Sequence, residues 1–234
     1  LMTATNSLSA SVTVSGTTAT VTISGATLSA VDLQALIDGL AYENTSDSPQ
    51  DSSTRAVTIT GLTDSGSATG GNSNAATLSL TSVVTLTAVN DAPDLANITT
   101  PIAGQVVAGS GAQAVSGLAG VTVSDVDSPE FNGGTLVLQQ TSGTNNGSWG
   151  VDGTVVTASG GATLSAGASL AINGTVIGTV DAVSDGQSGS ALSISFTTTD
   201  ATPAAVQLLL QNLTYAAPTG VETRGFSLTL TDGD

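Results

Sequence analysis

The chain has 234 residues and a formal net charge of −16, with 18 acidic side chains against two arginines and no lysine or histidine. This charge excludes nucleic acid and anionic membrane surfaces as partners, because both are bound through lysine and arginine. No apolar run reaches the roughly 18 residues that a membrane-spanning helix needs. Without histidine, cysteine or lysine, the usual catalytic nucleophiles, bases and zinc ligands are missing, so we expect no enzyme.

The apolar composition is aliphatic. Apolar residues make up 39% of the chain but aromatic residues only 3%, so the core must be built from valine, leucine, isoleucine and alanine. Threonine, serine, glycine and valine are abundant, and this composition favours β-structure with many turns. The length is sufficient for two modest domains.

The first 90 residues begin with a β-pattern and then change period. Residues 9–15 and 18–24 alternate polar and apolar side chains, which predicts two strands. Ser29 is a candidate N-cap for a short helix that follows them. The apolar stripe of this helix consists of Leu33, Leu36, Ile37 and Leu40. Two further strands are predicted at residues 55–62 and 76–88.

The segment Ala88–Asp94 has the sequence AVNDAPD and separates two similar patterns. Pro93 cannot donate a ladder hydrogen bond and holds the preceding residue extended, so the segment predicts a short, stiff joint. We therefore expect residues 1–90 to be the C-terminal part of a first β-sandwich repeat. Residues 91–234 are expected to form a second β-sandwich repeat that lacks its last strand.

An internal repeat supports this division. Residues 33–42 align without a gap with residues 206–215, an offset of 173 (206 minus 33), and both segments end in tyrosine. The two basic residues of the chain, Arg55 and Arg224, then fall at equivalent positions. Chance rarely produces such a coincidence, so the chain is a tandem repeat.

The second repeat shows many short strand patterns separated by glycine and asparagine turns, which predicts a β-sandwich. Its helix is expected to start after Thr202 and Pro203, an N-cap followed by a proline in the first helical turn. Trp149 is predicted to lie in an Asn/Gly-rich loop, where it either stacks on a bound sugar or, the favoured interpretation, half-fills a gap in the core.

Oxygen-bearing side chains gather around the joint. Asp125 and Asp127 stand two apart on a predicted turn and can aim both carboxylates at one ion, and Glu130 can add a bidentate ligand. Asn90 and Asp91 offer oxygens from the joint itself. Calcium takes about six to eight oxygen ligands, so the pattern predicts a Ca²⁺ site that stiffens the joint.

Two further turns carry candidate ligands. Asp64 ends a predicted strand and is expected to face the same junction, whereas Asp232 and Asp234 are expected to repeat that turn at the next junction. The alternative is that such residues bond only their own backbone and need no metal. This role is assigned to Asp152, Asp181, Asp185 and Asp200. Each arginine is expected to pair with a carboxylate or to cap backbone carbonyls.

The joint sequence Thr87–Pro93 (TAVNDAP) resembles the inter-repeat joint of cadherin-like and related repeats in giant bacterial surface adhesins of the RTX, type I-secreted kind. The segments Val123–Pro129 with Phe131–Gly134, the helix ending in Tyr215, and Leu228–Asp234 resemble other parts of the same repeat. The resemblance implies a mainly β fold of tandem Ig-like or cadherin-like β-sandwich modules, each here with one short helix, and calcium at the joints.

This resemblance implies a calcium-stiffened structural or extender repeat of a bacterial cell-surface adhesin, secreted and extracellular, that supports cell adhesion or biofilm attachment. Its expected partners are neighbouring repeats of the same chain and a cell-surface glycan or other surface. The alternatives are a subunit of an extracellular filament or surface lattice, completed by a donated strand, and a carbohydrate-binding module. The start of the chain lacks a basic region and an apolar core, so we expect a fragment without a signal peptide.

Overall fold

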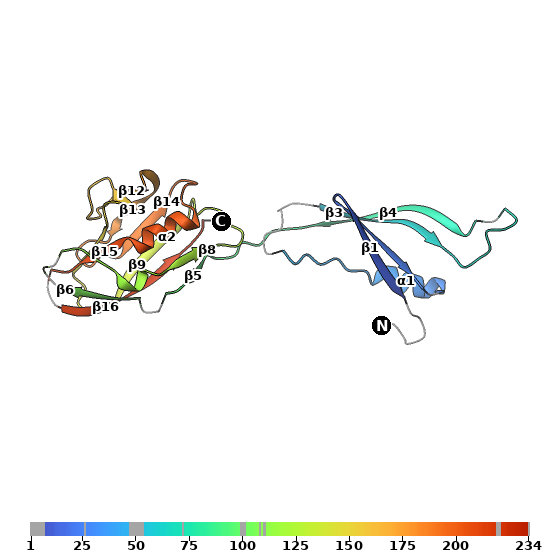
Figure 1. The fold of residues 1–234 in the computed structure, drawn as a ribbon, viewed down its shortest axis with the longest axis horizontal. Coiled ribbons are helices and arrows are strands. Elements are labelled where there is room, and N and C mark those ends of the chain that lie inside the picture. The colour runs from blue at the N-terminus through green and yellow to red at the C-terminus, as the bar shows by residue number, and fades with distance from the viewer. Residues whose placement is uncertain are drawn as a thin grey trace. The chain divides into compact units, whose positions relative to one another are not determined.

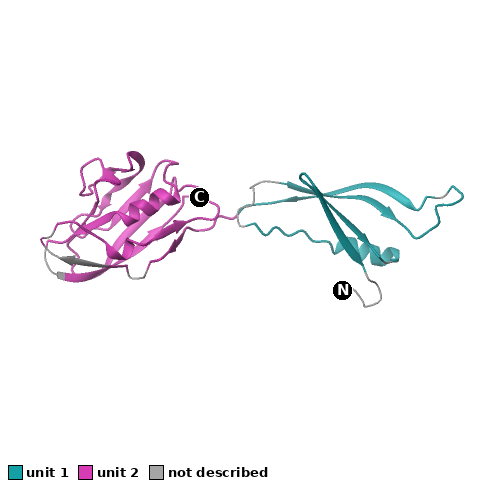
Figure 2. Ribbon diagram, viewed as in Figure 1, with its two compact units in different colours: residues 1–88 teal, residues 89–234 magenta. Residues whose placement is uncertain are grey.

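The computed structural model describes residues 8–25, 27–46, 54–71, 73–98, 102–107, 109, 111–218 and 221–233. The chain divides into two units, residues 1–88 and 89–234 (Figure 2). Both units are mainly β, which confirms the predicted fold class, and each has one α-helix within its described residues (Figure 1). The division places Asn90 in the second unit, together with every other residue of the joint except Ala88.

The first unit consists of two antiparallel hairpins and a helix. Strand β1 (Ser9–Ser15) pairs with β2 (Thr18–Ser24), and β3 (Thr54–Thr63) pairs with β4 (Ala75–Thr85). The predicted helix forms as α1 (Ala30–Asp38), because Ser29 Oγ accepts a hydrogen bond of 3.2 Å from the Asp32 N–H. This contact satisfies one of the free amides at the helix start.

The second unit contains most of the strands. They are β5 (Asp94–Ala96), β6 (Ile102–Val107), β7 (Gln113–Ala114), β8 (Thr122–Ser124), β9 (Thr135–Ser142), β10 (Ser148–Val151), β11 (Val156–Ala158), β12 (Ser169–Ile172), β13 (Thr175–Asp185), β14 (Leu192–Phe196), β15 (Leu213–Ala216) and β16 (Val221–Leu230). A 3₁₀ turn, η1 (Ser116–Leu118), precedes β8, and the helix α2 (Pro203–Gln211) precedes β15. The helix starts as predicted, with Thr202 as its N-cap.

A seven-stranded antiparallel sheet, in the order β11-β12-β13-β14-β9-β16-β6, forms one layer of the second unit. A three-stranded sheet, β10-β15-β7, and the pair β5-β8 complete the strands. The core contains side chains from β9, β14 and β16, from β10 and β15, and from α2, so apolar faces of both sheets and the helix are buried together. This arrangement is of the β-sandwich type.

Three aromatic rings form the centre of this core. The Trp149 ring centroid lies 5.1 Å from that of Tyr215 and 4.9 Å from that of Phe226, and the latter two are 5.0 Å apart. All three contacts are edge-to-face, the arrangement that aromatic pairs prefer. Trp149 lies in β10 and is 2% exposed, so the prediction of a loop position is wrong. The sugar-stacking role proposed for Trp149 is also wrong, because the side chain is buried in the core.

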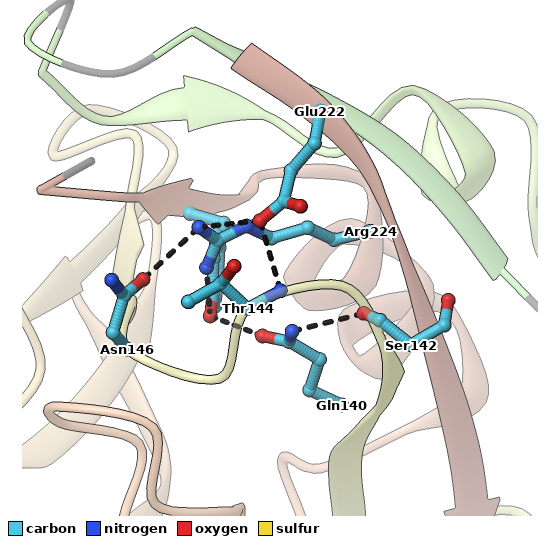
Figure 3. A network of polar contacts seen from close by, with 7 residues as sticks. Gln140, Ser142, Thr144, Asn146, Glu222 and Arg224 are labelled. Atoms are coloured by element: carbon cyan, nitrogen blue, oxygen red, sulfur yellow. Dashed lines mark hydrogen bonds and ion pairs between the residues drawn. The ribbon is translucent and has the colours of Figure 1, made fainter. Parts of the chain in front are cut away.

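A buried arginine connects this aromatic cluster to the loop after β9 (Figure 3). The Arg224 side chain is fully buried, and its Nη2 lies 3.1 Å from Glu222 Oε1 and donates to Asn146 Oδ1 at 3.0 Å. Nη1 donates to the Tyr215 hydroxyl, which in turn donates to Gln140 Oε1. The carboxylate pairing expected for this arginine is confirmed.

We expect Arg224→Ala to destabilise the second unit by about 2–4 kcal/mol, because it leaves buried polar partners unsatisfied. The measurement is urea unfolding followed by the fluorescence of Trp149, the only tryptophan of the chain. Arg55→Ala is the matched control: it removes the same charge from the equivalent position, where the arginine is exposed and donates only a 3.4 Å hydrogen bond to the Thr54 carbonyl among the contacts described. Equal shifts in the two variants would contradict a local role for Arg224.

Candidate functional site

The pairing of β5 with β8 brings the joint to the acidic turn. Asp94 is opposite Ser124 and Ala96 is opposite Thr122, and the same antiparallel register carried outward places Asp91 opposite Asp127. The Asp91 N–H donates to Asp127 Oδ2 at 3.1 Å. The joint is therefore attached to the turn after β8, within one unit.

The acidic turn is organised by its first aspartate. Asp125 Oδ1 accepts hydrogen bonds from the N–H groups of Asp127, at 3.1 Å, and Ser128, at 2.8 Å. The alternative that this residue bonds its own backbone thus holds for one carboxylate oxygen. The other oxygen, Oδ2, and Oδ1 of Asp127 are buried and have no hydrogen-bond partner among the residues that the structure describes. Buried carboxylate oxygens without a partner are costly, so these two atoms need an additional positive or donating group.

Asp232 completes the cluster from the other end of the unit. Strand β16 runs antiparallel to β9, and the Thr231 N–H donates to the Thr135 carbonyl just after the strand ends. Asp232 is 5% exposed, and its Oδ2 accepts a 3.0 Å hydrogen bond from Asn90 Nδ2. The prediction placed Asp232 at the next junction; the structure instead places it at the joint that precedes its own unit.

These contacts form one connected group, which we name the joint cluster. Its members are Asn90, Asp91, Asp125, Asp127, Ser128 and Asp232. The link between its two halves is Ser128, which is 2% exposed and whose Oγ donates to Asn90 Oδ1 at 3.5 Å. Sequence analysis missed Ser128; its position directly after the Asp-x-Asp pair was the available signal.

Glycines allow the end of β16 to approach the cluster. A Cβ built on Gly134 would lie 2.1 Å from the Thr231 carbonyl oxygen, and one built on Gly233, whose φ is +97°, would lie 2.4 Å from the Gly134 nitrogen. No side chain fits into such contacts without moving the backbone. Gly134 and Gly233 therefore set the position of Asp232, which lies between Thr231 and Gly233 in the chain.

The remaining predicted ligands are Glu130, Asp64 and Asp234. Glu130 is half-buried, and its Oε2 accepts a 2.7 Å hydrogen bond from the Asn132 N–H. Asp64 belongs to the first unit and accepts from the Gly66 N–H at 2.7 Å, as an isolated turn residue does. Asp234 lies outside the described residues. The structure therefore brings together Asn90, Asp91, Asp125, Asp127 and Asp232, and ties Glu130 to a neighbouring turn.

The joint cluster carries a strong negative charge. It contains the carboxylates of Asp91, Asp125, Asp127 and Asp232, whereas Arg224, the one basic residue of the second unit, lies near the opposite end of β16. Within the described ranges, no three acidic side chains already stand in an arrangement that could hold a metal ion. The carboxylates are held near one another by amide and hydroxyl hydrogen bonds, so a cation would have to draw them closer together.

Comparison of the chain with known protein families, with curated proteins and with solved structures finds no match. Neither helix in the described part of the chain is long and apolar enough to cross a membrane.

We expect Gly134→Ala to destabilise the second unit by about 2 kcal/mol or more, because the methyl group displaces the Thr231–Gly233 segment. Gly120→Ala serves as the control, since a Cβ there meets nothing within 4 Å. Urea unfolding monitored at Trp149 measures both. Similar midpoints for the two variants would show that the close approach at Gly134 does not constrain the fold.

Proposed function

We propose that the joint cluster binds Ca²⁺ and that the chain is a calcium-stiffened structural repeat of a bacterial cell-surface adhesin. The observation that carries the proposal is a pair of buried carboxylate oxygens, Asp125 Oδ2 and Asp127 Oδ1, that have no hydrogen-bond partner within the described part of the chain. A divalent cation next to them would offset both the burial and the mutual repulsion of the carboxylates.

The donor set of the cluster fits calcium better than other metals. It offers carboxylate oxygens from four aspartates, the amide oxygen of Asn90 and the Ser128 hydroxyl, with no nitrogen or sulfur ligand. Ca²⁺ accepts such oxygen ligands in flexible geometry, whereas zinc prefers histidine and cysteine and magnesium demands a near-ideal octahedron. The Asn90 and Ser128 oxygens now take part in hydrogen bonds, so binding would exchange some of these for ligation.

The position of the cluster explains what binding would accomplish. Asn90 and Asp91 belong to the joint, Asp125 and Asp127 to the turn after β8, and Asp232 to the segment after β16. A cation at this point ties together three segments that are far apart in the sequence. The joint then becomes part of the folded unit, which shortens the free linker in a tandem array.

The adhesin assignment is supported by the tandem repeat, the acidic composition without cysteine, and the resemblance of the joint to those of repeat adhesins. The expected partners are neighbouring repeats and a surface bound by the assembled fibre. The carbohydrate-binding alternative loses its candidate residue, because Trp149 is part of the core.

We expect Ca²⁺ to stabilise the second unit, by about 2.7 kcal/mol when its concentration is about 100 times Kd. The measurement is urea unfolding of the full chain at Trp149, in EDTA and in increasing CaCl₂. Extracellular modules bind calcium with Kd of about 0.1–1 mM, so no change up to about 10 mM CaCl₂ would overturn the proposal.

The variant Asp125→Asn distinguishes two roles of Asp125, metal ligand and organiser of the turn. An asparagine oxygen can still accept the two backbone hydrogen bonds that organise the turn. We expect this variant to be as stable as the parent or more stable in EDTA, since it removes one of the repelling charges, yet to lose most of the gain in calcium. Asp181→Asn is the control: Asp181 is exposed, lies outside the cluster in an irregular stretch of β13, and its Oδ1 accepts from the N–H groups of Val183 and Ser184. A calcium response of Asp125→Asn equal to that of the control would remove Asp125 from the site.

A further inference from the structure

Four elements of the first unit, β1, β2, α1 and β3, match elements in the C-terminal half of the second. Adding the offset of 173 to β2 gives residues 191–197, which contain β14. The N-caps Ser29 and Thr202 share this offset and nearly the same backbone angles, and each accepts from the N–H three residues later. Strands β3 and β16 carry the equivalent arginines. Strand β1 corresponds to β13. Val12 of β1 is opposite Val21, and Val180 of β13 is opposite Ile194, the equivalent of Val21.

Equivalent apolar residues are buried in the second unit and exposed in the first. Ile194, Phe196 and Tyr215 are 0–2% exposed, whereas their counterparts Val21, Ile23 and Tyr42 are 58%, 40% and 43% exposed. Further apolar side chains exposed in the first unit are Val12, Val14, Val31, Ile37, Leu40, Val57, Leu62, Leu80 and Val83. The first unit thus presents the apolar surface of a core without the elements that cover it.

One strand is missing from the middle of the first unit. In the second unit β9 lies between β14 and β16, with Leu138 opposite both Leu192 and Leu228 and Leu136 opposite both Ile194 and Leu230. In the first unit the equivalents β2 and β3 belong to separate two-stranded sheets, β1-β2 and β3-β4, and no described strand joins them. The two hairpins are drawn as separate ribbons in Figure 1.

Backbone hydrogen bonds show that the edge equivalent to the β9 side is the open one. The Thr231 N–H donates to the carbonyl of Thr135, the first residue of β9, so the next residue, Asp232, directs its N–H to the opposite side. The Asp64 N–H, equivalent to that of Asp232, donates to the Asn74 carbonyl just before β4. Strand β4 therefore takes the edge that β6 takes in the second unit, and the other edge of β3 is left for a β9-like strand.

We propose that the first unit is the acceptor of a donated segment of the same kind as residues 94–151, whose central strand inserts between β2 and β3. The inserted strand would carry leucines at alternate positions, as the sequence Thr-Leu-Val-Leu of β9 does. Main-chain hydrogen bonds to two strands and burial of the exposed apolar face supply the affinity. This inference goes beyond the calcium proposal and does not depend on it.

The donor is an upstream segment of the same polypeptide, not a second copy of this chain. In the second unit the strand that fills this place precedes β14 in the same chain. A second copy could lend its β9 only by unfolding its own core, because Leu136 and Leu138 are already fully buried there. An upstream segment meets no such cost and holds the donor at high effective concentration.

The test extends the full chain with a second copy of the donor. The added copy of residues 89–176 takes the place of residues 1–8 and ends directly before Ser9. This junction follows from the repeat: Ser9 is opposite Ser24 in the first unit, and Thr197, the equivalent of Ser24, donates its N–H to the Ile177 carbonyl. Ser9 is therefore the equivalent of Ile177. Amide hydrogen exchange is measured in EDTA, by mass spectrometry, over β2, α1 and β3. We expect exchange in these elements to slow at least about tenfold relative to the parent chain.

The control extension replaces the added copies of Leu136 and Leu138 by Asp, and we expect it to give no protection. If the extended chain does not fold, a synthetic peptide of residues 133–143 is added in excess to the parent chain, with the same exchange readout. Unchanged exchange over β2 and β3 in both experiments would overturn the proposal. So would a parent chain that sediments as a dimer with these strands already protected, because a second copy would then be the occupant.

Discussion

The pairing of β9 with strands on both of its sides is the interaction on which the second unit depends. It joins the β13–β14 hairpin to β16, which comes much later in the chain, and its leucines lie opposite apolar residues of both neighbours. The same pairing determines where β16 ends, and therefore where Asp232 lies. The first unit shows the arrangement without such a strand: its two hairpins, β1-β2 and β3-β4, belong to separate sheets. Apolar residues of these hairpins are exposed.

The joint cluster is a consequence of this sheet order combined with the β5–β8 pair. The sheet order places Asp232 beside Asn90, and the β5–β8 pair places Asp91 beside Asp127. Each contact lies within a network of backbone pairing that apolar burial drives, so the fold brings like charges together even though they repel. In the proposed function, a bound cation would offset this repulsion, which folding has already imposed.

Local patterns predicted the elements well because their causes are local. Period-two alternation identified β1 and β2, and the capping residues Ser29 and Thr202 identified both helices. The site was predicted in part: Asp125 and Asp127 share a turn, which their spacing reveals. The contact between Asn90 and Asp232 depends on strand order, which no local pattern encodes, so Asp232 was assigned to the wrong joint. Trp149 was misplaced because neighbouring glycines and asparagines indicate a loop, while the partners that bury it lie far away in the sequence.

The hydrogen bond between Asn90 and Asp232 spans 142 residues of sequence. Tension applied to the chain at these two positions would load this contact together with the contacts of Asp91 and Ser128 in the cluster. Nearly the whole unit lies, in sequence, between the two residues that this hydrogen bond joins, and a bound divalent ion would reinforce their contact. Once this hydrogen bond breaks and the sheet unfolds, the extended chain between the two residues has a contour length of roughly 500 Å, at about 3.5 Å per residue.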